Sequence, residues 1–200
     1  MNPLNSIKGT IISGLILAAL IMQFVIGWAG EMSLIIWIHV LAGVTWIGLL
    51  YYFNFVQVPA LAEAGSDASG PGGAGILKYA APRALLWFRW GAVVTWLSGA
   101  TFLYRIDTNT SNGLIQAFSL QEGYTVIGIG AWLGTIMLFN VWVLIWPNQK
   151  KVLGITSASD SEKAQAKKVA GLASRTNTLL SIPMLLCMIG SSFHGMHIIL

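Results

Sequence analysis

Five long apolar segments constrain this chain more than any other feature of its sequence. Each reaches the roughly 20 residues that a helix needs to cross a bilayer core of about 30 Å. Because backbone polar groups find no water inside lipid, such segments cross a membrane as helices. The sequence therefore predicts an all-α integral membrane protein, a single transmembrane domain over residues 1–200, with spans at about 9–29, 32–56, 84–105, 123–146 and 177–199.

Composition agrees with this class and excludes several others. Hydrophobic residues make up 56% of the chain and charged residues only 9%, which is typical of membrane proteins rather than soluble ones. The single cysteine, Cys187, allows no disulfide framework and no Cys-x-x-Cys-His haem attachment motif. The spans contain no paired carboxylates, no Ser-His-Asp set and no glycine-rich phosphate loop, so we assign no catalytic residue. Any enzymatic reaction would depend on a cofactor.

Basic residues alternate along the chain between connections that are rich and poor in them. The basic positions are Lys8, then Lys78, Arg83 and Arg89, then Lys150, Lys151, Lys163, Lys167, Lys168 and Arg175. The positive-inside rule then predicts a cytoplasmic N-terminus and a periplasmic C-terminus. This distribution suits membrane orientation, and we expect no nucleic-acid partner.

The second and fourth spans share a motif. Trp-Ile-Gly followed by Phe-Asn, at 46–54, recurs as Trp-Leu-Gly followed by Phe-Asn, at 132–140, with the same offset for every match. Gly99 and Phe102 recur more loosely as Gly190 and Phe193. We expect a pseudo-duplicated four-helix bundle in which the two motifs occupy equivalent places on neighbouring, parallel helices, with the first helix outside. Chance similarity between apolar segments is the alternative. The asparagines of the two motifs, Asn54 and Asn140, should bond between helices.

The histidines offer the clearest candidate site. His39 lies in the second span, where an imidazole needs a partner, and Gly43 one turn away leaves a notch without a β-carbon. His194 lies in the fifth span, and Gly190 lies one turn deeper. Both histidines are roughly 9–10 Å from the outer surface at 1.5 Å per residue, so they can face each other.

This arrangement fits axial ligation of a b-type haem by His39 and His194, with Gly43 and Gly190 under the ring. Arg105, at the outer end of the third span, is placed to pair with a propionate, or else is an interface arginine that reaches water. His197 lies one turn shallower than His194 and could replace it, bind a second metal or lie at the interface. A copper or zinc site built from His39, His194 and His197 is an alternative. Another is that the histidines bind no cofactor and bond only to neighbouring helices.

Three stretches carry a resemblance to a known family. They run from His39 through Thr45-Trp46-Ile47-Gly48 to Asn54, from Gly134 through the WPNQKKV run, and over the ASRTNTLLSIPM run at 173–184. They resemble the membrane domain of the bacterial membrane-bound, cytochrome-c-linked urate oxidase family. The shorter pattern His-x6-Trp-x-Gly is also similar to membrane copper-resistance and haem-dependent protoporphyrinogen oxidase proteins.

The resemblance implies a redox-associated, multi-pass module of the bacterial inner membrane, in a short form without the family's cytochrome c domain. We therefore expect a haem-b-binding electron-transfer subunit, or a membrane oxidoreductase component, that exchanges electrons with a separate cytochrome or quinone. Two alternatives stay open. One is a non-catalytic structural subunit of a larger membrane complex, and the other is a copper-handling membrane protein.

Overall fold

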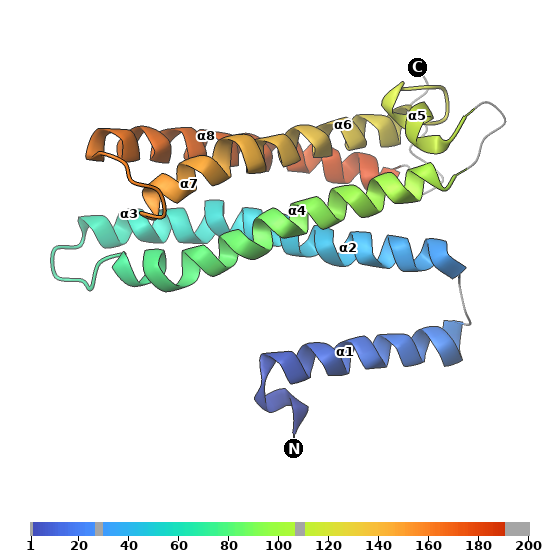
Figure 1. Cartoon of the computed structure of the whole chain (residues 1–200), viewed down its shortest axis with the longest axis horizontal. Coiled ribbons are helices and arrows are strands. Elements are labelled where there is room, and N and C mark those ends of the chain that lie inside the picture. The colour runs from blue at the N-terminus through green and yellow to red at the C-terminus, as the bar shows by residue number, and fades with distance from the viewer. Residues whose placement is uncertain (1, 27–29, 107–110, 191–200) are drawn as a thin grey trace.

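The computed structural model describes residues 2–26, 30–106 and 111–190, and within these ranges it contains helices and no strand (Figure 1). The all-α prediction is confirmed. The longer helices are α1 (Ile7–Ile21), α2 (Gly30–Tyr51), α4 (Ala81–Tyr104), α6 (Thr125–Phe139) and α8 (Asp160–Gly190). The shorter ones are η1 (Pro3–Asn5), α3 (Val58–Ser66), α5 (Gly113–Phe118) and α7 (Trp146–Val152), with π-helical segments η2 (Met22–Ile26), η3 (Tyr52–Gln57), η4 (Ile76–Ala80) and η5 (Asn140–Ile145).

Among the described residues, four helical stretches are long and apolar enough to cross a membrane. They correspond to the first, second, fourth and fifth predicted spans and cover Ile7–Phe24, Gly30–Ser66, Thr125–Val152 and Asp160–Gly190. The third predicted span forms α4, whose 24 residues give it the required length. Its tryptophans, hydroxyl residues and Arg89 lower its mean hydropathy, so α4 is not among the four.

The bundle consists of two closely packed helix pairs. α2 packs against the antiparallel α4, and α6 packs against the antiparallel α8 (Figure 1). The first pair approaches closely at Gly91, where a β-carbon would lie 3.4 Å from the backbone nitrogen of Trp46, just within ordinary contact. In the second pair, a β-carbon at Gly130 would lie 3.0 Å from Cys187 Cβ. Small residues thus let the backbones meet, as expected for helices packed in lipid.

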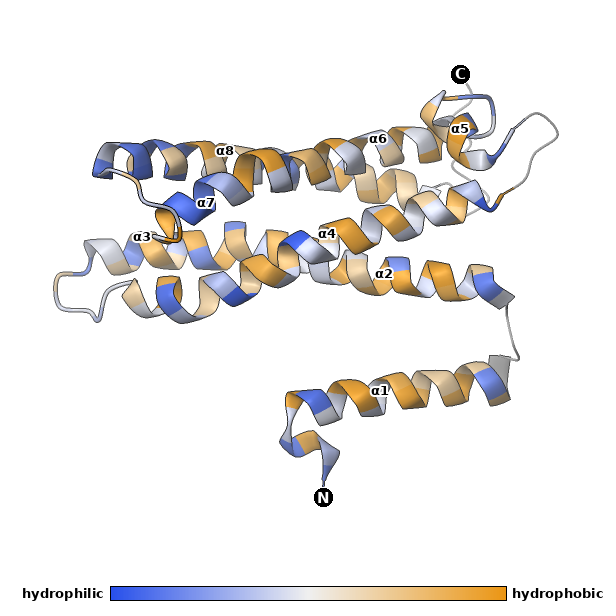
Figure 2. Cartoon of the chain, in the orientation of Figure 1, coloured by the Kyte–Doolittle hydropathy of each residue, from blue (hydrophilic) through white to orange (hydrophobic). Residues whose placement is uncertain are grey.

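The core lies where the two pairs meet. Its fully or almost fully buried apolar side chains come from every helix of the bundle and include Trp46, Leu50, Phe88, Ala92, Met137, Val141 and Met184. Many large apolar side chains remain exposed, as a lipid-facing surface requires. Hydrophobic residues are distributed along the long helices (Figure 2). By contrast, α1 has no buried residue and lies apart from the four-helix bundle (Figure 1).

The repeated motifs lie on α2 and α6, which run in the same direction (Figure 1). However, each of these helices packs mainly on its own partner, α4 or α8, so α2 and α6 are not a packed pair. The prediction that segments 46–54 and 132–140 lie on neighbouring helices is wrong. Both motifs run into π-helical segments, η3 and η5, and a proline follows each at Pro59 and Pro147. A proline lacks the N–H and clashes with the preceding turn, which accounts for irregular helix geometry at both places.

The polar residues 160–175 are helical and continue without a break into the fifth span as the 31-residue α8. The first half of α8, α7, and the loop between α3 and η4 lie at one end of the bundle (Figure 1). These elements carry most of the basic residues, in agreement with the charge alternation in the sequence.

Candidate functional site

His39 lies near the middle of α2 with its ring against α4. Its Nδ1 is 2.8 Å from the backbone carbonyl oxygen of Thr95. Because a carbonyl can only accept, Nδ1 carries the proton and donates this bond. The hydroxyl of Ser98 is a more distant neighbour of the same nitrogen, at 3.4 Å. The ring is therefore oriented, and its Nε2 keeps a lone pair that has no hydrogen-bond partner among the described residues.

Gly99, one turn beyond Thr95 on α4, makes room for the imidazole. A β-carbon at Gly99 would lie 2.9 Å from His39 Cε1 and 3.1 Å from its Nδ1, too close without movement of the ring. Gly43 instead faces Thr95, since a β-carbon there would lie 3.7 Å from Thr95 Cγ2 in ordinary contact. The glycine in direct contact with His39 is therefore Gly99. Sequence reasoning singled out Gly99 only as part of a loose repeat and missed this contact.

Arg105 follows α4 directly and pairs with Glu31 in the first turn of α2. Their charged groups are 2.7 Å apart, and both side chains are exposed. This ion pair joins the ends of α2 and α4, about two helical turns along α2 from His39. Arg105 thus has a protein partner, whereas the propionate contact predicted for it stays a prediction.

The other predicted site residues lie at the end of α8 or beyond it. Gly190 is the last residue of α8 and is buried. His194 and His197 lie outside the described residues, so their approach to His39 stays a prediction. Within the described ranges, no three His, Cys, Asp or Glu side chains come together as a metal site. The copper or zinc alternative therefore gains no support from this part of the chain.

A second group of polar residues lies in the bundle interior and centres on α8. Asn140 donates to Asn177 Oδ1 at 2.8 Å, and Asn177, which is fully buried, donates to the carbonyl of Met137 at 3.0 Å. Asn54 donates to the hydroxyl of Ser174 at 2.8 Å. The prediction that Asn54 and Asn140 bond between helices is confirmed, and both bonds end on α8.

Two more side chains extend this polar group. Tyr51 and Ser181 hydroxyls lie 3.0 Å apart, and Ser181 is fully buried. Ser174, Asn177 and Ser181 are spaced three and four residues apart, which puts them on one face of α8. That spacing was readable in the sequence as a polar stripe inside an apolar helix. Because polar side chains bond strongly where water is excluded, the stripe joins α2 and α6 to α8.

The hydrogen bond of His39 is of a kind that metal-binding histidines also make. Ligating histidines commonly donate their second ring nitrogen to a backbone carbonyl, which fixes the tautomer and the ring plane. His39 shows this feature through Thr95, and its Nε2 has no competing partner in the described part of the chain. One such donor does not make a closed metal site, because a second axial ligand has to come from elsewhere.

Together, the fold and the site define an all-helical protein with several helices able to cross a membrane and an oriented histidine between two of them. Residues 105–198 match the family model described as urate oxidase N-terminal, so this part of the chain is related to that family. The matched range holds two of the three stretches that carried the resemblance, together with His194 and His197. No curated protein and no solved structure matches the chain.

Proposed function

We propose that this chain is a redox-associated membrane module of the urate oxidase type that holds haem b between His39 and His194. The observation that carries the proposal is the orientation of His39, whose Nδ1–H is donated to Thr95 while Nε2 stays available. The relation of residues 105–198 to urate oxidases supports an oxidoreductase role. A bound haem would supply one-electron transfer.

The residues of this chain have separate tasks under the proposal. His39 would hold the haem through its Nε2, and the Thr95 carbonyl keeps the proton on Nδ1. Gly99 leaves space for the imidazole, whereas Gly43 packs against Thr95. Under the proposal, Gly190 at the end of α8 would leave space for the edge of the haem. Arg105 would pair with a propionate in exchange for its present partner, Glu31. Under the proposal, His197 has a minor part.

The topology follows from the same proposal. α4 crosses the membrane as a fifth span, because it runs beside the apolar α2 and is as long as its neighbours (Figure 1). The chain spans a bacterial inner membrane, with its N-terminus in the cytoplasm and its C-terminus in the periplasm. The alternation of basic and base-poor connections supports this orientation. Electrons would pass to or from a separate cytochrome or a membrane quinone.

A second candidate function rests on α1. This helix is apolar, has no buried residue and lies apart from the bundle, which is the form expected of a segment that packs in a larger membrane assembly. In that case the chain is a non-catalytic subunit, and the bond from His39 to Thr95 is purely structural. The absorption spectrum of the purified full chain separates the two functions, because only the haem protein has redox-sensitive Soret and α bands.

A further inference from the structure

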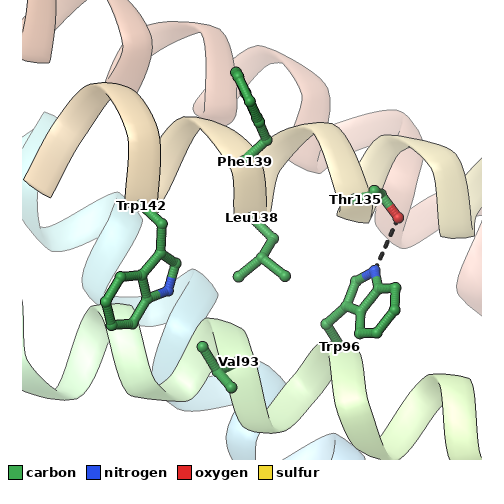
Figure 3. Close-up of a pocket in the computed structure, with 6 residues that line it drawn as sticks. All are labelled: Val93, Trp96, Thr135, Leu138, Phe139 and Trp142. Carbon is green, nitrogen blue, oxygen red and sulfur yellow. Dashed lines mark hydrogen bonds between the residues drawn. The ribbon is translucent and has the colours of Figure 1, made fainter.

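A groove of about 370 Å³ runs between α4 and α6, away from the α2–α4 contact that holds His39. Its walls are aromatic and aliphatic, and the residues that line it are Val93, Trp96, Thr135, Leu138, Phe139 and Trp142 (Figure 3). The groove opens on the surface of the bundle, which would face lipid. It is therefore reached from the membrane rather than from water.

The polar atoms at one end of the groove are satisfied. Trp96 Nε1 donates to the hydroxyl of Thr135 at 2.8 Å, and that hydroxyl donates in turn to the carbonyl of Ala131 at 2.8 Å (Figure 3). Neither group needs a ligand. Any specific contact has to come from the other end.

At that other end, Trp142 Nε1 is shielded from solvent and has no hydrogen-bond partner within the described part of the chain. Figure 3 shows this nitrogen on the edge of the indole that faces Leu138 and Val93. The ring is braced by Trp90, with centroids 5.5 Å apart in an edge-on contact. A buried N–H without an acceptor is costly, and lipid offers no water to replace one. The groove thus has an unpaired donor just behind its wall, and a ligand oxygen reaches this donor only when the neighbouring side chains move aside.

We propose that this groove binds a membrane quinone, whose ring lies between Trp96 and Trp142 and whose ring carbonyl accepts the Trp142 N–H. A quinone is flat and uncharged, and its acceptors are on the ring itself, so it brings a carbonyl into the hydrocarbon region. Phospholipid carbonyls stay at the interface, whereas Trp142 lies four residues inside the predicted end of the fourth span, roughly 6 Å deep. The redox use of this site rests on the proposed function, but binding does not.

The test measures binding of decylubiquinone to the purified full chain by equilibrium dialysis, with empty detergent micelles subtracted. Trp142→Phe removes the N–H and keeps an aromatic ring, and it should weaken binding about three- to tenfold. Trp132→Phe is the matched control, because Trp132 Nε1 donates to the carbonyl of Phe118 outside the groove. It should leave binding unchanged. Val93→Trp, which fills the groove, should abolish binding.

Decylbenzene, which has the same chain and no carbonyl, should bind the wild-type protein weakly and Trp142→Phe equally weakly. Equal decylubiquinone binding by the wild type and Trp142→Phe would overturn the proposal. So would equal binding of decylbenzene and decylubiquinone, which would show a groove that takes any apolar chain, including lipid. Haem spectra of the same samples distinguish the two proposals. If the protein shows haem bands but does not bind decylubiquinone, only the quinone site is wrong. If it binds decylubiquinone but shows no haem bands, only the haem proposal is wrong.

Discussion

His39 donates its Nδ1–H to the backbone carbonyl of Thr95 across the α2–α4 contact, at 2.8 Å. This bond satisfies the donor of a histidine in an apolar setting and, at the same time, fixes which nitrogen stays free. A structural histidine and a ligand therefore share this geometry, and they differ only in what meets Nε2.

The contact between Gly99 and His39 should be sensitive to one added carbon. In Gly99→Ala the β-carbon would lie 2.9 Å from His39 Cε1, so the ring has to shift and its bond to Thr95 weakens. We expect a loss of about 1–3 kcal/mol in the free energy of unfolding, measured by SDS titration of the solubilised protein. Gly48→Ala is the control, because nothing lies within 4 Å of a β-carbon there, and it should change stability by less than about 1 kcal/mol. Equal effects of the two substitutions would show that the contact is unimportant.

The buried bonds of Asn177 should stabilise the bundle. Asn177→Ala leaves the amide of Asn140 and the carbonyl of Met137 without their partner. The expected cost is about 1–3 kcal/mol in the same unfolding measurement. Thr176→Ala is the neighbouring control, since this exposed hydroxyl bonds only within its own helix, to Leu172, and it should be close to neutral. An unchanged free energy of unfolding in Asn177→Ala would contradict this prediction and would mean that the bundle repacks around the missing side chain.

Variants of Arg105 and Glu31 distinguish the role of Arg105 in the ion pair from its predicted contact with a haem propionate. The exposed pair is worth at most about 1 kcal/mol, so neither Arg105→Gln nor Glu31→Gln should unfold the protein. If Arg105 binds a propionate, Arg105→Gln lowers haem retention during gel filtration, whereas Glu31→Gln retains haem. Equal retention by both variants would leave Arg105 with the ion pair as its only role.

The topology is testable by labelling from outside intact cells. In a Cys187→Ser background, Asp160→Cys at the start of α8 should react with an impermeant maleimide only after permeabilisation. Gln121→Cys, between α5 and α6 at the opposite end of the bundle, should react at once. Both positions are exposed, so access to the side chain itself does not limit the reaction. The reverse pattern would contradict the assignment of the basic end to the cytoplasm.

Much of the fold was predictable, because length and apolar composition alone specify helices in a membrane. The predicted spans overlap the long helices in the described part of the chain, although α4 is not among the four that are apolar enough to cross a membrane. The π-helical segments around Asn54 and Asn140 were not predicted, because the prolines that follow them indicate irregular helix geometry without specifying a π-helix. The sequence also did not show that α2 and α6 lie diagonally across the bundle. A repeated motif indicates that two helices run in the same direction, but not which helices pack together.

The candidate site was only partly predictable. His39 was visible as an imidazole in an apolar span, but its partner is a backbone carbonyl, and every residue has one. Gly99 became identifiable only when the register between α2 and α4 was known. Asn54 and Asn140, by contrast, were predictable as bonds between helices, because amides in apolar helices need partners.

The most direct test of the haem proposal is the reduced-minus-oxidised absorption spectrum of the purified chain and three histidine variants. The wild type should show the Soret and α bands of a six-coordinate b-type haem, and His39→Ala and His194→Ala should each abolish or shift them, because an axial ligand is lost. His197→Ala, the control, should change them much less. A wild-type protein without these bands after haem reconstitution, or unchanged bands in His39→Ala and His194→Ala, would contradict bis-histidine ligation.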